Sequence, residues 1–209
     1  MASPRRITFS SAIDKTPDGR CIGLLGGSFN PAHEGHVEIS MLAIERLKLD
    51  AVWWLVTPQN PLKPVDEMAA LGQRLDEARR IASDTGILVT DIERTLHTQY
   101  TADSLEALKQ LLPKLYFVWL MGADNLVEMH KWRKWESIFS TVPVAVFARP
   151  TYSIRAESAR ASRRFARFKI KSYRSASLAK MRAPAWVFFK RPLNPLSASK
   201  IRDAMNLDN

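Results

Sequence analysis

The chain has 209 residues, and at about 150 residues per domain this length predicts one domain with an appendage rather than two large lobes. Hydrophobic residues make up 46% of the chain and charged residues 25%, which excludes a wholly disordered or fibrous protein. The formal net charge is +10, from 31 Lys and Arg against 21 Asp and Glu, but nearly all of it lies in one segment, so a nucleic-acid-binding face over the whole body is not indicated.

The sequence also predicts a cytoplasmic protein. The longest apolar runs, such as residues 115–122, are far shorter than the ~18 residues of a membrane span, so no membrane partner is expected. Residues 1–20 lack the continuous apolar stretch of a signal peptide, and we expect them to form a flexible leader before a domain at 21–209. The single cysteine, Cys21, cannot form an intramolecular disulfide, which fits a reducing compartment.

Apolar runs that predict buried strands alternate with segments of helical periodicity up to residue 148. The expected strands are 21–26, 51–57, 87–92, 115–121 and 142–148. The expected helices are 35–48, 67–83, 101–112 and 125–139. Continuously apolar strands are typical of a parallel sheet with helices on both faces. The sequence therefore predicts an α/β fold, a doubly wound parallel sheet in a single domain.

A basic segment follows the fifth strand. Residues 149–184 are too many for an ordinary loop and too basic for a core. Between Arg155 and Arg182 the chain has ten basic residues and one acid, Glu157, so nearly all of the net charge lies there. We expect a partly helical basic insertion at about 151–184, a return to the sheet at 185–189 and a terminal helix at 197–205.

The most informative motif is GGSFNPAHEGH at residues 26–36, which runs from the first strand into the first helix. Gly26 and Gly27 let the backbone approach a ligand closely. A helix start offers unpaired N–H groups that attract a phosphate, and His33 and His36 can donate to the same anion. The pattern does not match a Walker loop, a GxGxxG fingerprint or an HExxH zinc motif. An ordinary alternative is that one histidine caps the helix and the other is half-buried.

A second polar cluster, NPLSASKIR, lies at residues 194–202. Ser197 is a suitable N-cap, which leaves Ser199 and Arg202 on one face of the first helical turn beside the positive end of the helix. This arrangement would also suit a phosphate. A serine cap near Lys and Arg is common helix chemistry, so the cluster carries weight only together with the first motif.

Ligands of doubly wound folds bind at the carboxyl ends of the strands. We therefore expect residues 26–36, 57–63 and 122–124 to converge on one site.

Together these motifs resemble the nucleotidyltransferase superfamily with an HxGH motif, and within it the bacterial nicotinate-nucleotide adenylyltransferase family. The resemblance extends over about residues 26–202 and rests on seven marks in the order of the family. They are GGSFNPAHEGH at 26–36, QNPLK at 59–63, QYTADSL at 99–105, GAD at 122–124, Trp132, ARP at 148–150 and LSASKIR at 196–202. It implies a Rossmann-like nucleotidyltransferase fold.

The resemblance implies transfer of the adenylyl group of ATP to nicotinate mononucleotide, with Mg²⁺ and without a covalent intermediate. His33 and His36 would stabilise charge on the α-phosphoryl group, and Arg202 with Ser199 would bind the leaving phosphates. The remaining ATP-binding residues would be Gly26, Gly27, Phe29, Asp124 and Ser197.

The resemblance also implies a mononucleotide site. Ser28 and Lys63 would bind the phosphate, Trp132 would stack on the pyridine ring, and Thr101 with the backbone of Arg133 would meet the carboxylate. Thr101 could instead only cap its helix. Because Trp132 and Trp135 lie on one predicted helix, we expect one in the core and the other at the site.

Two alternatives stay open. The substrate could be nicotinamide mononucleotide or another phosphate such as phosphopantetheine, although Thr101 and Trp132 favour a pyridine nucleotide. A protein of another class would bind RNA through residues 155–182, where Phe165, Phe168 and Tyr173 lie among the arginines. A charge run is more often a solvated face, so nucleic acid is not the favoured partner. A homo-oligomer is compatible with the sequence.

Overall fold

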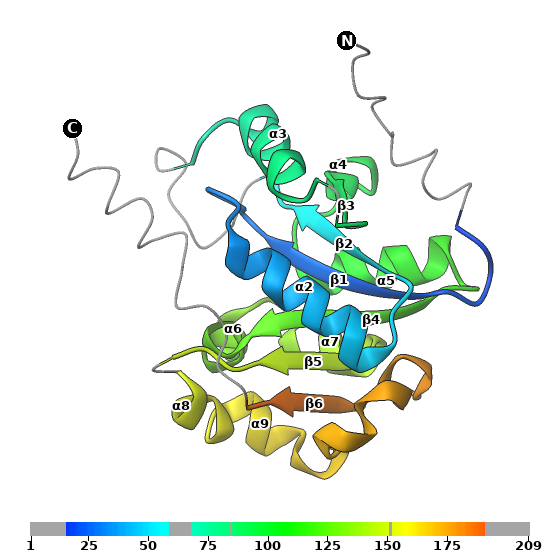
Figure 1. Ribbon diagram of the computed structural model, residues 1–209. Coiled ribbons are helices and arrows are strands. Elements are labelled where there is room, and N and C mark those ends of the chain that lie inside the picture. The colour runs from blue at the N-terminus through cyan, green and yellow to red at the C-terminus, as the bar shows by residue number, and fades with distance from the viewer. Residues whose placement is uncertain (1–15, 59–67, 84, 151, 191–209) are drawn as a thin grey trace.

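The computed structural model describes residues 16–58, 68–83, 85–150 and 152–190 (Figure 1). Several predicted features lie outside the described residues, namely most of the leader, Lys63, and the C-terminal cluster with Ser197, Ser199 and Arg202. In the part of the chain that is described, no helix combines the length and the apolar character that a membrane span requires.

Six parallel strands form one sheet in the order β3-β2-β1-β4-β5-β6 (Figure 1). They are β1 (Cys21–Gly27), β2 (Ala51–Val56), β3 (Leu88–Thr90), β4 (Tyr116–Gly122), β5 (Val144–Phe147) and β6 (Trp186–Phe189). The first strand, β1, lies inside the sheet. β2 and β3 extend the sheet from β1 to one edge, and β4, β5 and β6 extend it from the other side of β1 to the opposite edge. The predicted doubly wound parallel sheet is confirmed, and its strand order reverses between β1 and β4, where such folds bind ligands.

Helices cover both faces of this sheet. One face carries α2 (Glu34–Leu47) and α3 (Leu71–Ile81), and the other carries α4 (Ile92–Thr95), α5 (Thr101–Leu111), α6 (Ala123–Glu128) and α7 (Trp135–Thr141). Successive strand residues point to opposite faces, so the buried Trp53 and Trp54 enter different cores. The two cores explain why the strands are apolar throughout.

The predicted helix at 125–139 is wrong as a single element. The chain forms α6, a short 3-10 helix η2 (Met129–Lys131) and, after a break, α7. Trp132 has an extended backbone, and Lys134 has a φ of 50°, in the left-handed region. Apolar periodicity continues across this break, which is why the sequence pattern did not show it. Trp132 therefore lies in a loop.

The basic insertion wraps the β6 edge of the sheet. It contains α8 (Ser153–Glu157), α9 (Arg160–Arg164) and the 3-10 helices η3 (Ala166–Phe168) and η4 (Ser172–Lys180). Phe165 is buried in one core and Leu178 in the other, so the segment passes from one face to the other. The Ile170 N–H donates to Trp186 O of β6 over 2.8 Å. The predicted helical content and the return to the sheet are found, and the insertion itself covers part of the β6 edge.

Candidate active site

The expected convergence of loops is found at the carboxyl ends of the strands for the described residues. The Thr57 N–H, after β2, donates to Gly27 O at the end of β1 over 3.0 Å. Arg149 Nε, after β5, lies 3.1 Å from Asp124 Oδ1, which follows β4. Arg149 is also near enough to both histidines of the first motif to perturb them electrostatically. Four neighbouring strands thus contribute to one polar site.

The loop after β1 is shaped by close packing. A Cβ at Gly26 would collide with the indole of Trp119 on β4, so only glycine fits there. Phe29 has a φ of 46°, a left-handed conformation that is uncommon for a side chain of its size. Its ring is 2% exposed and lies 4.7 Å from the His36 ring and 5.0 Å from the Trp54 ring, measured between centroids. Phe29 therefore supports His36 from the core side.

The two motif histidines face each other at the start of α2. His33 is the N-cap residue, only 4% exposed, and its ring centroid lies 3.8 Å from that of His36. The His33 N–H donates to His36 Nδ1 over 3.2 Å, which leaves the proton of a neutral His36 ring on Nε2. His33 Nδ1 is buried and has no hydrogen-bond partner among the described residues. A buried nitrogen of this kind can exchange a hydrogen bond with a bound ligand.

The pKa values of both histidines are lowered, so both rings are neutral at pH 7. Burial, with a smaller contribution from Arg149, lowers the pKa of His33 to about 4. Burial, His33 and Arg149 together hold the pKa of His36 well below its usual value of 6.5. A bound phosphate would act in the opposite direction, because an anion favours the protonated ring.

These pKa shifts predict acid sensitivity. The unfolded histidines take up protons near pH 6.5, whereas the folded His33 does so only near pH 4. The free energy of unfolding therefore has its full value above pH 6.5, and it decreases as the pH falls from 6.5 towards 4. Each histidine should lower the free energy of unfolding by up to about 1.4 kcal/mol per pH unit in that range.

Urea unfolding of the ligand-free protein at pH 7.5, 6.0 and 5.0 measures this slope. A His33→Asn variant should show a shallower decline than the wild type. Equal slopes in the two proteins would show that His33 titrates normally in the fold.

The Asp124–Arg149 pair occupies the centre of the site. Asp124 lies in the first turn of α6, and Gly122 precedes that helix as its N-cap. A Cβ at Gly122 would run into the Asp124 carboxylate and the Arg149 side chain, so the glycine makes room for the pair. Arg149 was not predicted as a site residue, although its place directly after a buried strand beside β4 was a usable signal.

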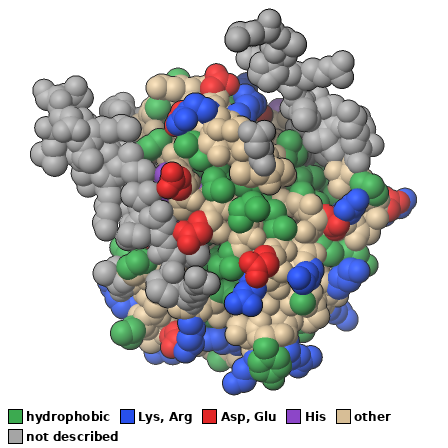
Figure 2. All heavy atoms as spheres, viewed as in Figure 1, with side chains coloured by type: hydrophobic (Ala, Val, Ile, Leu, Met, Phe, Trp, Pro, Cys, Tyr) green, Lys and Arg blue, Asp and Glu red, His purple; other side chains and the backbone are tan. Residues whose placement is uncertain are grey.

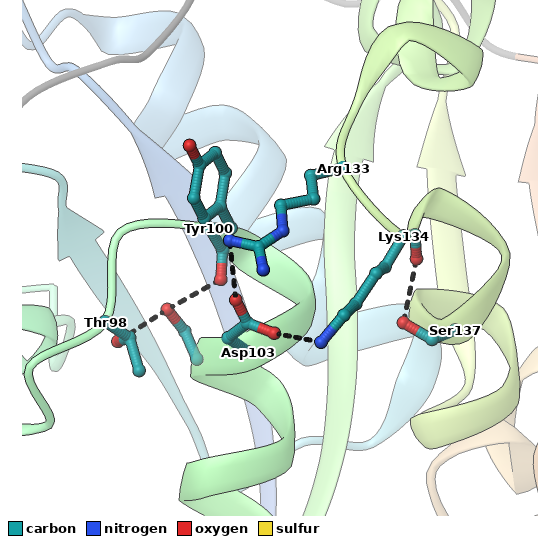
Figure 3. Close-up of polar contacts among 7 residues, drawn as sticks. Thr98, Tyr100, Asp103, Arg133, Lys134 and Ser137 are labelled. Carbon is teal, nitrogen blue, oxygen red and sulfur yellow. Dashed lines mark hydrogen bonds and ion pairs between the residues drawn. The ribbon is translucent and has the colours of Figure 1, made fainter.

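Two of the expected mononucleotide residues, Thr101 and Arg133, lie near the start of α5, and Figure 3 shows the Arg133 side chain beside Tyr100 and Asp103. Thr101 is the first residue of α5 and Tyr100 is the N-cap residue, so the alternative that Thr101 caps this helix is wrong. The Arg133 guanidinium lies 4.7 Å from the centre of the Tyr100 ring. Asp103 accepts a hydrogen bond from Lys134 Nζ over 3.0 Å, and its other oxygen lies 3.8 Å from Arg133 Nη1. These contacts hold the loop with Trp132 beside α5.

The surroundings of Trp132, Trp135 and Ser28 do not by themselves indicate a ligand. The Trp132 and Trp135 indoles are both half-buried, and Trp135 packs edge-on against Phe165. Ser28 is partly exposed directly after the glycine pair. The roles of these residues towards a ligand stay predictions.

The sequence is similar to that of a known protein family. The family model described as cytidylyltransferase-like matches residues 24–204. A protein of Cereibacter sphaeroides named "probable nicotinate-nucleotide adenylyltransferase" is 50% identical over 181 residues, which cover 87% of this chain and 96% of that protein. Proteins with the same name from Methylorubrum extorquens and Rhizobium johnstonii are 48% and 45% identical, over 87% and 88% of this chain and 98% and 93% of their own length.

The fold was compared with solved structures. The nicotinic acid mononucleotide adenylyltransferase of Plasmodium falciparum, in complex with NaAD, superposes with a TM-score of 0.65 at 18% identity, covering 87% of this chain and 82% of that one. The same protein in complex with APC gives a TM-score of 0.63 over 88% and 83% of the two chains. These neighbours show the Rossmann-like nucleotidyltransferase fold. The chain belongs to the cytidylyltransferase-like family and, within it, to the nicotinate-nucleotide adenylyltransferases.

Proposed function

We propose that this protein transfers the adenylyl group of ATP to nicotinate mononucleotide, giving nicotinate adenine dinucleotide and pyrophosphate in NAD biosynthesis. The observation that carries the proposal is the His33–His36 pair. His33 Nδ1 is buried and lacks a partner among the described residues. The pair lies beside Arg149, where the strand order of the sheet reverses. This arrangement suits an anion such as a phosphate. The names of the relatives point to the same reaction.

The reaction requires little covalent chemistry from the protein. An oxygen of the mononucleotide phosphate attacks the α-phosphorus of ATP and forms a new P–O bond, while the bond from that phosphorus to the bridging oxygen breaks and pyrophosphate leaves with the electron pair. The attacking phosphate is already an anion, so it needs no general base. The protein therefore has to position the two substrates and to stabilise the charge that develops on the α-phosphoryl group. N–H groups of His33 and His36 and the charge of Arg149 would supply that stabilisation.

The other contacts follow from the family pattern. Ser199 and Arg202 would bind the leaving pyrophosphate. Mg²⁺ would arrive with ATP and neutralise phosphate charge, with phosphate oxygens and water as its main ligands. In the described part of the chain no three His, Cys, Asp or Glu side chains are grouped as a metal site.

The pyridine end of the substrate would lie at the start of α5. Trp132 would stack on the ring, and the Thr101 hydroxyl and the Arg133 N–H would donate to the carboxylate, while Ser28 and Lys63 would bind the mononucleotide phosphate. The positive end of α5 favours the nicotinate carboxylate over a neutral amide.

Pyrophosphate release with ATP and Mg²⁺ tests the proposal when nicotinate and nicotinamide mononucleotide are compared. We expect kcat/KM to be at least about 10-fold higher for nicotinate mononucleotide, and Thr101→Val to reduce this preference by about 10-fold, because one hydrogen bond to a charged group is lost. Equal rates with the two nucleotides would overturn the predicted carboxylate contact. No release with either nucleotide would overturn the substrate.

A further inference from the structure

Arg74 is a buried cation outside the expected site. Its side chain lies on α3, and the residue is only 3% exposed. Within the described ranges its guanidinium donates four hydrogen bonds, each to a backbone carbonyl oxygen. The acceptors are Ala69 O at 2.9 Å from Nε, Ser28 O and Thr57 O at 2.7 and 2.8 Å from Nη1, and Pro58 O at 2.9 Å from Nη2.

These bonds join three stretches of chain that are far apart in the sequence. Ser28 belongs to the loop after β1, Thr57 and Pro58 follow β2, and Ala69 precedes α3. The Ala69 N–H also donates to Asn30 Oδ1 over 3.3 Å, which ties the same stretches together a second time. Three nitrogens in one plane reach all four oxygens, a geometry that the single ammonium group of lysine cannot reproduce.

In the described part of the chain, no carboxylate balances the charge of Arg74. Among the described residues none of the ion pairs involves Arg74, and burial alone lowers its pKa from the ordinary value. Burying a cation is costly to the fold when neutral carbonyls are its partners, as they are for Arg74 among the described residues. An anion bound next to the Ser28 loop would gain from this charge, since the low local dielectric strengthens the attraction.

We propose that Arg74 is a positioning residue for the acceptor phosphate, that is, for the phosphate of the mononucleotide. It fixes the loops after β1 and β2 in their binding geometry, and its buried charge adds attraction for a dianion bound against Ser28. The inference rests on the proposed function, because it takes the mononucleotide as the ligand of Ser28. It assigns Arg74 chiefly to binding of the acceptor, because its hydrogen bond to the loop after β1 is to Ser28, whereas the side chains expected to stabilise the α-phosphoryl group of ATP are those of His33, His36 and Arg149.

Steady-state kinetics with both substrates varied separate this role from a general structural one. Arg74→Lys keeps the charge but loses the planar set of donors, and Arg74→Met removes the charge. We expect KM for nicotinate mononucleotide to rise about 10-fold in Arg74→Lys and about 100-fold in Arg74→Met, with KM for ATP changed less than about 2-fold. Arg79→Met is the matched control, because Arg79 lies exposed on the same helix.

Hydrogen–deuterium exchange of the ligand-free protein gives a readout that does not depend on turnover. Overlapping peptides should show faster exchange at Ser28, Asn30 and Thr57 in Arg74→Lys than in Arg79→Met. Lower thermal stability with an unchanged ratio of the two KM values would overturn the inference and leave Arg74 a structural residue. If Arg74→Met does not fold, Arg74→Lys decides the question alone.

The two proposals fail in different ways. If the wild type does not convert nicotinate mononucleotide, the proposed function is wrong and the role of Arg74 towards that nucleotide falls with it, while the exchange data still show whether Arg74 orders the loop. If the wild type is active and Arg74→Lys leaves KM for nicotinate mononucleotide unchanged, only the inference about Arg74 is wrong.

Discussion

Replacing His36 with alanine is expected to lower kcat for pyrophosphate release by about 10²–10³-fold, the size of effect found when one fixed donor to a developing negative charge is removed. The backbone N–H of His33 occupies Nδ1 of this ring, so Nε2–H is the donor that a phosphoryl oxygen would use. The ring also needs no reorganisation, because Phe29 and His33 already pack against it. KM for nicotinate mononucleotide should change much less than kcat.

Two further variants make the His36 result interpretable. His36→Gln keeps an N–H donor on a flexible side chain and should recover part of the lost rate. His130→Ala is the control, since His130 is exposed and its Nδ1 lies 3.0 Å from Val127 O of the preceding turn. If His36→Ala retained near wild-type kcat, the histidine pair would be a helix-start packing feature, and the anion site would have to be sought elsewhere.

The sequence predicted the fold well because the signals for it are local. Five continuously apolar runs separated by helical periodicity specify a parallel sheet without knowledge of any distant contact. The break at Trp132–Lys134 was missed for the opposite reason. Lys134 takes a left-handed backbone while its ammonium binds Asp103, 31 residues away, and no pattern within the segment reports that contact.

The same distinction separates the predicted from the missed site residues. His33 and His36 were found because they are three positions apart at the start of one helix. This spacing brings the two rings together and is visible in a short motif. Arg74 was missed because its acceptors lie 5, 16, 17 and 46 residues away, and only the folded chain brings them to one guanidinium. Arg149 stood in a recognised motif, but its effect on the histidines requires the neighbouring positions of β1, β4 and β5.

Arg149→Met is expected to be as damaging as the loss of His36, with kcat reduced by about 10²–10³-fold, because a cation beside a transferring phosphoryl group stabilises the charge that develops there. The change also leaves the Asp124 carboxylate without this ion pair, so the site becomes more negative where ATP would bind. Arg149→Lys keeps the charge and should be milder. Arg155→Met is the control, since Arg155 is an exposed cation of the basic insertion.

A titration of His33 distinguishes this electrostatic role from a loss of structure. Arg149 lowers the pKa of His33, so Arg149→Met should raise that pKa from about 4. The pKa should stay below 6.5, because burial is the larger cause and is retained. The acid-dependent loss of folding free energy should then begin at the same pH but be smaller in total, since the folded and unfolded pKa values lie closer together. A folded Arg149→Met protein with an unchanged His33 titration would show that Arg149 does not act on the histidine pair, and its effect on kcat would then have to arise through Asp124.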